Sequence, residues 1–240
     1  MFRNRIFITG LCAASLLAWN TCVRRDPASS MSQKSETTMS QKIRNYKLLG
    51  DFAPTFYRIL DERAPEWKDE ARTEALLTVE GKLIERVTPS FKQQLDIEGS
   101  ARLRDGRIVN FHQKIDGSWR YLVALHAPFG LGIDGYKLIP YRTLAVDSEV
   151  IGPGLVLYIP ALDGVRLPSG EIHDGFVFTH DEGQGITGKR IDVFVGFESD
   201  VDNTLTRSGR IEDMEPVEVY QVDDETAARL NRKYEKQFAR

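Results

Sequence analysis

Both the fold and the chemistry depend on one stretch, residues 178–196, with the sequence FTHDEGQGITGKRIDVFVG. It begins and ends in residues typical of β-strands, and glycine recurs between them. Asp181 and Asp192 stand eleven positions apart in this stretch. The pattern predicts a strand, a glycine-rich loop and a second strand that carries an aspartate.

Asp192 is the unusual residue of the stretch, because it lies among Ile191, Val193 and Phe194. Charged side chains are rarely buried without a partner. The period-two alternation of a strand puts Asp192 on the face opposite Ile191 and Val193 and on the same face as Phe194. Partial removal from water beside Phe194 would raise the pKa of this carboxyl and favour its protonated form, as a general acid requires.

A second stretch, residues 144–159, has the sequence LAVDSEVIGPGLVLYI. Asp147 precedes its Pro-Gly turn and can bind the backbone locally, which favours a structural role. The chain around both stretches contains many short strand candidates separated by glycine turns. This spacing predicts a compact β-barrel or sandwich. Residues 223–240 have helical periodicity and predict a C-terminal helix.

Together the two stretches resemble the three-aspartate (3D) domain of the membrane-bound lytic transglycosylase A family, and a domain of some secreted proteins that degrade cell walls. The matching aspartates are Asp147, Asp181 and Asp192, and the close match spans about residues 140–197. The sequence departs from the family pattern at Gln184, which replaces a glycine, and at Glu182, which adds a charge.

The resemblance implies a mainly β fold, a double-psi β-barrel over residues 46–240 with an inserted region at about 61–139 and a C-terminal helix. It implies a lytic transglycosylase that acts on the glycan strands of peptidoglycan without a metal or organic cofactor. The enzyme would cleave the MurNAc–GlcNAc β-1,4 bond to give anhydro-MurNAc ends. Asp192 maps to the acid/base and Asp181 to a second catalytic aspartate. The positions assigned to substrate binding or structure are Asp147, Gly183, Gly185, Gly188, Lys189 and Arg190.

Two other functions stay open. A barrel with only about 80 residues for a second lobe, and with Gln184 in its loop, is compatible with a non-catalytic module that binds the cell wall. A hydrolase that gives reducing ends would need a second carboxylate at a set distance from Asp192. Asp192 itself has a structural alternative, the capping of backbone amides in the psi loop.

The composition describes an ordinary soluble globular chain. It has 240 residues, 41% of them hydrophobic and 28% charged, and a formal net charge of −3. This near-neutral balance argues against a dedicated nucleic-acid binder, which usually has a basic face. The two cysteines, Cys12 and Cys22, both lie near the N-terminus. A disulfide scaffold and a cysteine-ligated zinc site in the body of the chain are therefore excluded.

The N-terminus predicts export. Arg3 and Arg5 precede an apolar run over residues 6–19, which is typical of a secretory signal, assigned here to residues 1–22. A short membrane anchor is the alternative. Residues 23–45 predict a flexible linker. We expect a periplasmic or outer-membrane-associated protein, although the residues before Cys22 fit a lipidation signal poorly. The oligomeric state stays open.

Overall fold

A computed structural model describes residues 43–183 and 185–238 of this chain. The predicted signal segment, Cys22 and nearly all of the predicted linker lie outside the described residues. Within the described residues, no helix combines the length and the apolar composition needed to cross a membrane.

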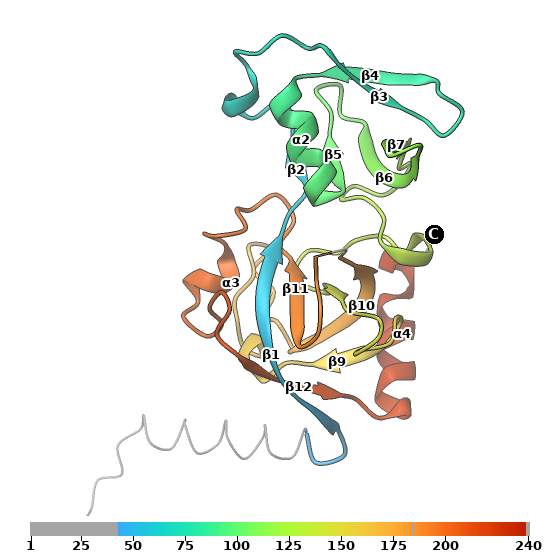
Figure 1. Cartoon of the computed structure of the whole chain (residues 1–240). Coiled ribbons are helices and arrows are strands. Elements are labelled where there is room, and N and C mark those ends of the chain that lie inside the picture. Colours follow the sequence, from blue (N-terminus) through green and yellow to red (C-terminus); the bar gives the residue numbers. More distant parts are fainter. Residues whose placement is uncertain (1–42, 184, 239–240) are drawn as a thin grey trace, which may run out of the picture. The chain divides into compact units, whose positions relative to one another are not determined.

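Six strands close into a barrel in the order β1-β11-β8-β10-β9-β12 (Figure 1). They are β1 (Lys47–Tyr57), β8 (Thr143–Val146), β9 (Val156–Tyr158), β10 (Phe176–Glu182), β11 (Arg190–Phe194) and β12 (Val217–Gln221). The pairs β1–β11 and β8–β10 are parallel, and the other four are antiparallel. The predicted mainly β fold with a closed barrel is confirmed, whereas its double-psi topology stays a prediction.

The barrel interior is filled by alternate side chains of its strands. Ile191 and Val193 of β11 and Leu144 and Val146 of β8 belong to this buried cluster. Successive side chains of a strand point to opposite faces, so Asp192 lies on the outer face of the barrel. Phe194, on the same outer face, packs in a different cluster. The predicted orientation of Asp192 is therefore confirmed.

Between β1 and β8 the chain forms a second group of elements over residues 60–123, called here the small lobe (Figure 1). Its strands form a four-stranded sheet, β2-β5-β6-β7, and a hairpin, β3-β4. The small lobe has its own buried cluster, which includes Leu76, Phe91 and Tyr121. Its elements are β2 (Leu60–Asp61), η1 (Pro65–Trp67), β3 (Glu74–Leu77), β4 (Leu83–Val87), α2 (Pro89–Glu98), β5 (Ser100–Arg102), β6 (Ile108–Ile115) and β7 (Ser118–Val123).

Local signals fix the ends of α2. Thr88 accepts a hydrogen bond from the Phe91 N–H and caps the helix, and Pro89 occupies its first position. Gly99 ends the helix in the left-handed conformation, at φ 78°. Both boundaries thus follow from signals within a few residues of the chain. Glu98, the last residue of the helix, therefore directly precedes Gly99, after which the chain enters β5.

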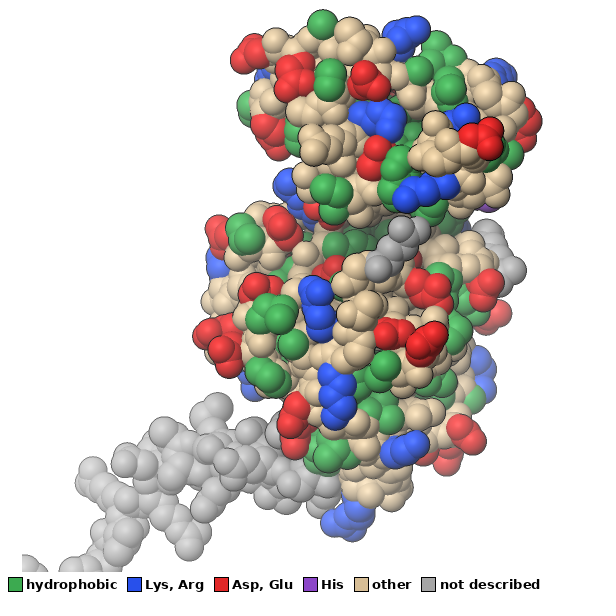
Figure 2. All heavy atoms as spheres, in the orientation of Figure 1, with side chains coloured by type: hydrophobic (Ala, Val, Ile, Leu, Met, Phe, Trp, Pro, Cys, Tyr) green, Lys and Arg blue, Asp and Glu red, His purple; other side chains and the backbone are tan. Residues whose placement is uncertain are grey.

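The remaining elements are short apart from the C-terminal helix. The predicted C-terminal helix is present as α4 (Asp224–Phe238), and the Asp223 carboxylate accepts a hydrogen bond from the Thr226 N–H at 2.8 Å. Leu230 and Tyr234 of α4 are buried against Phe178 of β10 and its neighbours. The others are η2 (Ile133–Gly135), η3 (Pro160–Leu162) and α3 (Thr204–Arg207). On the face seen in Figure 2, acidic and basic side chains are interspersed.

Candidate active site

One row of residues crosses four neighbouring barrel strands and carries two of the three aspartates. Thr55 of β1 pairs with Asp192 of β11, and Asp192 pairs with Ala145 of β8. Ala145 pairs on its other side with Asp181 of β10. Directly paired residues present their side chains on the same face of a sheet. The row therefore places Asp181 and Asp192 on the outer face, with one strand between them.

A β-bulge aims Asp181 at this face. Phe178 pairs with Thr143 and Asp181 with Ala145, so three steps along β10 match two along β8. Phe178 packs outside the barrel, and strict alternation would then point Asp181 inward. The extra residue reverses that direction, as bulges do at the rims of barrels. Period-two reasoning on the sequence alone does not reveal this correction.

Asp192 is a partly buried carboxyl, and one of its two oxygens lacks a hydrogen-bond donor in the described part of the chain. Among the described residues, none donates a hydrogen bond to its Oδ1 atom, which is shielded from solvent. Burial raises the pKa of Asp192 to about 7, and the negative charges of Glu98 and Asp181 act in the same direction. The Thr55 hydroxyl and Arg190 oppose that rise. The site therefore holds a carboxyl that is still partly protonated near neutral pH.

Asp181 has donors on both of its oxygens. The Tyr57 hydroxyl donates to Oδ2 at 2.7 Å, and the N–H of Glu182 donates to Oδ1 at 2.9 Å. Burial raises the pKa of Asp181 to about 6, and these two donors lower it. The pKa of Tyr57 lies well above its ordinary value, because burial and the adjacent carboxylates disfavour the phenolate. Tyr57 therefore stays neutral, so it donates a hydrogen bond but does not transfer its proton.

Glu98 reaches the same site from the small lobe. Its side chain is 8% exposed and accepts hydrogen bonds from the Arg58 N–H at 3.2 Å and the Gln94 amide at 3.1 Å. Its charge acts on both Asp192 and Tyr57. Sequence reasoning missed Glu98. A signal was present, since a carboxylate as the last residue of a helix opposes the helix dipole and requires another reason for its place.

Asp147 lies apart from this row and binds backbone. Its Oδ1 accepts from the Glu149 N–H at 3.0 Å, and its Oδ2 accepts from the Gly188 N–H at 2.7 Å. The second bond joins the turn after β8 to the loop before β11. Gly188 has φ 65°, a conformation that disfavours any side chain. The carboxylate of Asp147 thus holds the loop that leads into the strand of Asp192.

The other predicted loop positions lie between β10 and β11. Gly183 is close to Ile186, because a Cβ atom on it would lie 2.5 Å from the Ile186 side chain. Gly185 is exposed, and its carbonyl accepts a hydrogen bond from Arg190 at 3.2 Å. Lys189 extends over the ring of Phe52, with 5.8 Å between Nζ and the ring centre. Gln184 lies outside the described residues.

The two histidines beside the motif occupy packed positions. His173 is fully buried, accepts from the Gly175 N–H at its Nδ1 atom and meets the Tyr141 carbonyl at its Nε2 atom. His180 stacks on Tyr136 with ring centres 4.0 Å apart. In the part of the chain that the structure describes, no group of three or more His, Cys, Asp or Glu side chains is arranged to hold a metal ion.

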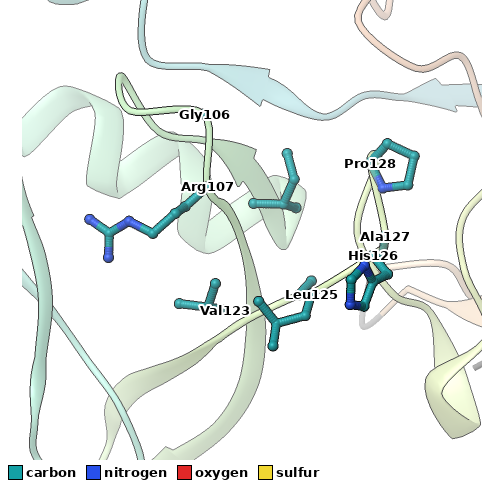
Figure 3. A pocket seen from close by; sticks show the side chains of 9 residues that line it. Gly106, Arg107, Val123, Leu125, His126, Ala127 and Pro128 are labelled. Atoms are coloured by element: carbon teal, nitrogen blue, oxygen red, sulfur yellow. The ribbon is translucent and has the colours of Figure 1, made fainter.

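A depression of about 450 Å³ lies in the small lobe and the segment that leaves it (Figure 3). Val123, Leu125 and Pro128 line it, and Figure 3 shows the Arg107 guanidinium pointing away from it. That guanidinium instead pairs with Asp105. The aspartates of the motif are not among its lining residues, so this hollow is separate from the site.

Comparison with protein families identifies the 3D domain over residues 142–215. The matched segment runs from the residue before β8 to the residues after α3 and includes Asp147, Asp181 and Asp192. A comparison with curated proteins found no match.

The chain is also similar to solved structures. One is Escherichia coli MltA with bound chitohexaose, with a TM-score of 0.48, 12% identity and 81% of each chain covered. Another is a membrane-bound lytic murein transglycosylase from Agrobacterium tumefaciens, with a TM-score of 0.44, 13% identity and 76% of each chain covered. A third is the lytic transglycosylase LtgG of Burkholderia pseudomallei, with a TM-score of 0.38, 17% identity and 82% of this chain and 80% of that chain covered. The resemblance to the three-aspartate domain inferred from the two sequence stretches is thus confirmed for residues 142–215.

Proposed function

We propose that this protein is a lytic transglycosylase that cleaves the MurNAc–GlcNAc β-1,4 bond of peptidoglycan, with Asp192 as its acid and base. The observation that carries the proposal is the contrast within one row of the barrel. Asp181 has two hydrogen-bond donors, whereas Asp192 has a shielded oxygen without one. Two carboxyls whose surroundings separate their pKa values are the usual basis of acid–base assignments. The resemblance of these residues to the three-aspartate domain of lytic transglycosylases, with the 3D match over residues 142–215, supports peptidoglycan as the substrate class.

The reaction begins with a proton transfer from Asp192. Its carboxylic acid protonates the glycosidic oxygen, and the bond between that oxygen and C1 of MurNAc breaks. The leaving GlcNAc thereby gains its free 4-hydroxyl. Positive charge develops on C1 and the ring oxygen of MurNAc in the transition state. A carboxyl that is still protonated near pH 7 is suited to this step.

The second step uses the substrate as its own nucleophile. Asp192, now a carboxylate, takes the proton from the C6 hydroxyl of the same MurNAc. The C6 oxygen forms a bond to C1 and closes the 1,6-anhydro ring. Asp192 ends the cycle protonated, and no water is consumed. One carboxyl therefore serves both steps, in contrast to the two carboxyls of ordinary glycosidases.

Asp181 is suited to stabilise the positive charge that develops between these steps. Its hydrogen bonds from Tyr57 and from its neighbouring N–H favour the ionised form. A fixed negative charge near a cationic transition state lowers the barrier without moving during the reaction. Because Asp181 must be ionised and Asp192 protonated, we expect activity to be highest between the two values of about 6 and about 7.

The test is the digestion of purified peptidoglycan sacculi by the protein and by its Asp192→Asn variant. Soluble products are identified by mass spectrometry. We expect anhydro-muropeptides from the wild type and a rate at least about a thousandfold lower from the variant. Asp147→Asn is the matched control, since it changes a carboxylate of the same motif whose two oxygens accept from backbone N–H groups. We expect this control to form the same products.

Each other outcome contradicts the proposal in a definite way. Products with reducing ends would show hydrolysis and would assign Asp181 the part of a second catalytic carboxyl. Retention of the protein on sacculi without soluble products would indicate a module that binds the wall. Equal activity of Asp192→Asn and the wild type would remove Asp192 from the chemistry.

A further inference from the structure

We propose that Glu98 of the small lobe is a positioning residue that keeps the proton on Asp192. This inference rests on the proposed function. Glu98 is not part of the matched segment, because it precedes residue 142 by a long stretch of chain. It extends the acid–base site from the barrel into the small lobe.

The geometry brings three carboxyls to the end of β1. Tyr57, the last residue of β1, holds Asp181 through its hydroxyl at 2.7 Å. The next residue, Arg58, holds Glu98 through its backbone N–H at 3.2 Å. The row through Thr55 brings Asp192 to the same strand. One short segment therefore connects to all three acids.

The number of hydrogen-bond donors to each carboxyl decides which of these acids carries the proton. Glu98 accepts from a backbone N–H and an amide, and the Arg58 guanidinium lies 3.9 Å from its Oε1 atom. Asp181 accepts from a hydroxyl and an N–H. Oδ1 of Asp192 has no donor among the described residues. In a cluster of coupled carboxyls, the negative charge settles where hydrogen bonds support it and the proton stays where they do not.

The charged groups around Asp192 are consistent with this distribution. Glu98 from α2 and Asp181 from β10 raise its pKa, and Arg190 from its own strand lowers it. The pKa of Glu98 lies above its ordinary value because of burial; the charge of Asp200 adds to this rise, and Arg58 and Gln94 oppose it. Ionised Glu98 therefore disfavours a second charge on Asp192. The small lobe, through one residue at the end of α2, sets the pH range in which the acid works.

The test is a carbon-13 NMR titration of the side-chain carboxyls in the full protein labelled at aspartate and glutamate. The Asp192 signal is assigned by its loss in Asp192→Asn. We expect Glu98→Gln to move the Asp192 midpoint to lower pH by about half a unit or more. Glu98→Gln retains an oxygen for the Arg58 N–H, whereas Glu98→Asp retains the charge and should keep the midpoint near its wild-type value. Glu66→Gln, at an exposed position of the small lobe, is the control and should leave it unchanged.

An unchanged Asp192 midpoint in folded Glu98→Gln protein would overturn the inference. The order of ionisation gives a second test that needs only the wild type. Glu98 should lose its proton at lower pH than Asp192, and the reverse order would contradict the assignment. Neither measurement depends on enzymatic activity. A failure of the inference is therefore distinguishable from a failure of the proposed function, which would appear as sacculi left intact.

The kinetic counterpart uses the same variants. Lowering the pKa of Asp192 leaves less of the acid form at neutral and alkaline pH, so Glu98→Gln should move the alkaline limb of the rate profile to lower pH. A residue needed only for the stability of α2 would lower the amount of folded protein and leave that limb in place.

Discussion

Two carboxyls withdrawn from water, Glu62 in the small lobe and Asp192 on the barrel, have opposite surroundings: the first is fully buried and the second partly buried. Glu62 is fully buried, yet Arg72 lies 2.9 Å from its Oε1 atom and the Arg104 N–H donates to Oε2 at 2.9 Å. The Arg104 guanidinium approaches within 3.5 Å. Asp192 has a shielded oxygen with no donor among the described residues. The negative charge of Glu62 is offset by two arginines and serves structure, whereas the shielded Oδ1 of Asp192 has no donor among the described residues and is available for chemistry.

The largest effect on stability should follow from breaking the paired acid. Glu62→Gln keeps the shape and one acceptor but removes the counter-charge of Arg104 and leaves Arg72 with Glu85 alone, 3.7 Å away. We expect the free energy of unfolding to fall by about 3 kcal/mol, because a charge-assisted hydrogen bond is lost and the new amide NH2 group is buried against guanidinium groups that cannot accept from it. Chemical denaturation measures this change. Glu66→Gln, at an exposed position, is the control and should change stability little. A loss no larger than that of the control would remove the contrast between the two acids.

The unpaired acid should behave in the opposite way. The pKa of Asp192 is raised from 3.8 to about 7 in the folded protein, so the folded state binds more protons than the unfolded state between these values. Stability from this group is therefore present below pH 3.8 and is lost as the pH rises through about 7. Asp192→Asn cannot ionise, and we expect it to be more stable than the wild type at pH 8 by about 1–3 kcal/mol.

This gain should shrink as the pH falls and vanish only below pH 3.8, where Asp192 is neutral in both the folded and the unfolded wild type. Thermal unfolding at pH 8 and pH 5 measures the difference. The variant that loses activity is thus expected to gain stability, as is common where a site is arranged for function. Equal destabilisation at both pH values would mean that Asp192 acts as a structural cap.

The smallest effect concerns the donor to Asp181. Tyr57→Phe removes the hydroxyl that donates to Oδ2 and leaves the ring packed against Phe194, 5.1 Å away between centres. The pKa of Asp181 should rise, and less of it is then ionised near pH 7. We expect kcat to fall about tenfold, equivalent to ~1.4 kcal/mol, with the acidic limb of the profile moved to higher pH. Measurement of kcat and KM separates this effect from weaker binding, which would raise KM alone.

Features that depend on neighbouring residues were predictable from the sequence. Thr88, Pro89 and Gly99 mark the ends of α2, and the alternation around Asp192 gives its direction. The hairpin β3–β4 follows from Glu80-Gly81, and its register pairs Glu74 with Val87. Each of these signals acts through the backbone within a few residues, where sequence patterns are informative.

Features that depend on distant contacts were not predictable. The bulge before Asp181 is defined by the pairing of β10 with β8, which the sequence of β10 alone does not contain. Glu98 reaches the site because α2 packs in the small lobe and Arg58 links that lobe to the barrel. The Tyr57 hydroxyl, one of the two donors that distinguish Asp181 from Asp192, comes from β1, more than a hundred residues earlier in the chain. The motif thus identified the acids, while their different proton affinities needed the tertiary structure.

The bulge in β10 also bears on how this domain tolerates changes in chain length. Both residues within the bulge make contacts: the Thr179 hydroxyl donates to the Gly152 carbonyl at 2.9 Å, and His180 stacks on Tyr136. A deletion of one residue between Phe178 and Asp181 would restore two-for-two pairing and still leave the aspartate opposite Ala145. Related chains can therefore differ by one residue here and keep the carboxyl on the outer face. An alignment of such sequences needs a gap between Phe178 and Asp181. Without that gap it would match Asp181 to the residue before or after the equivalent aspartate.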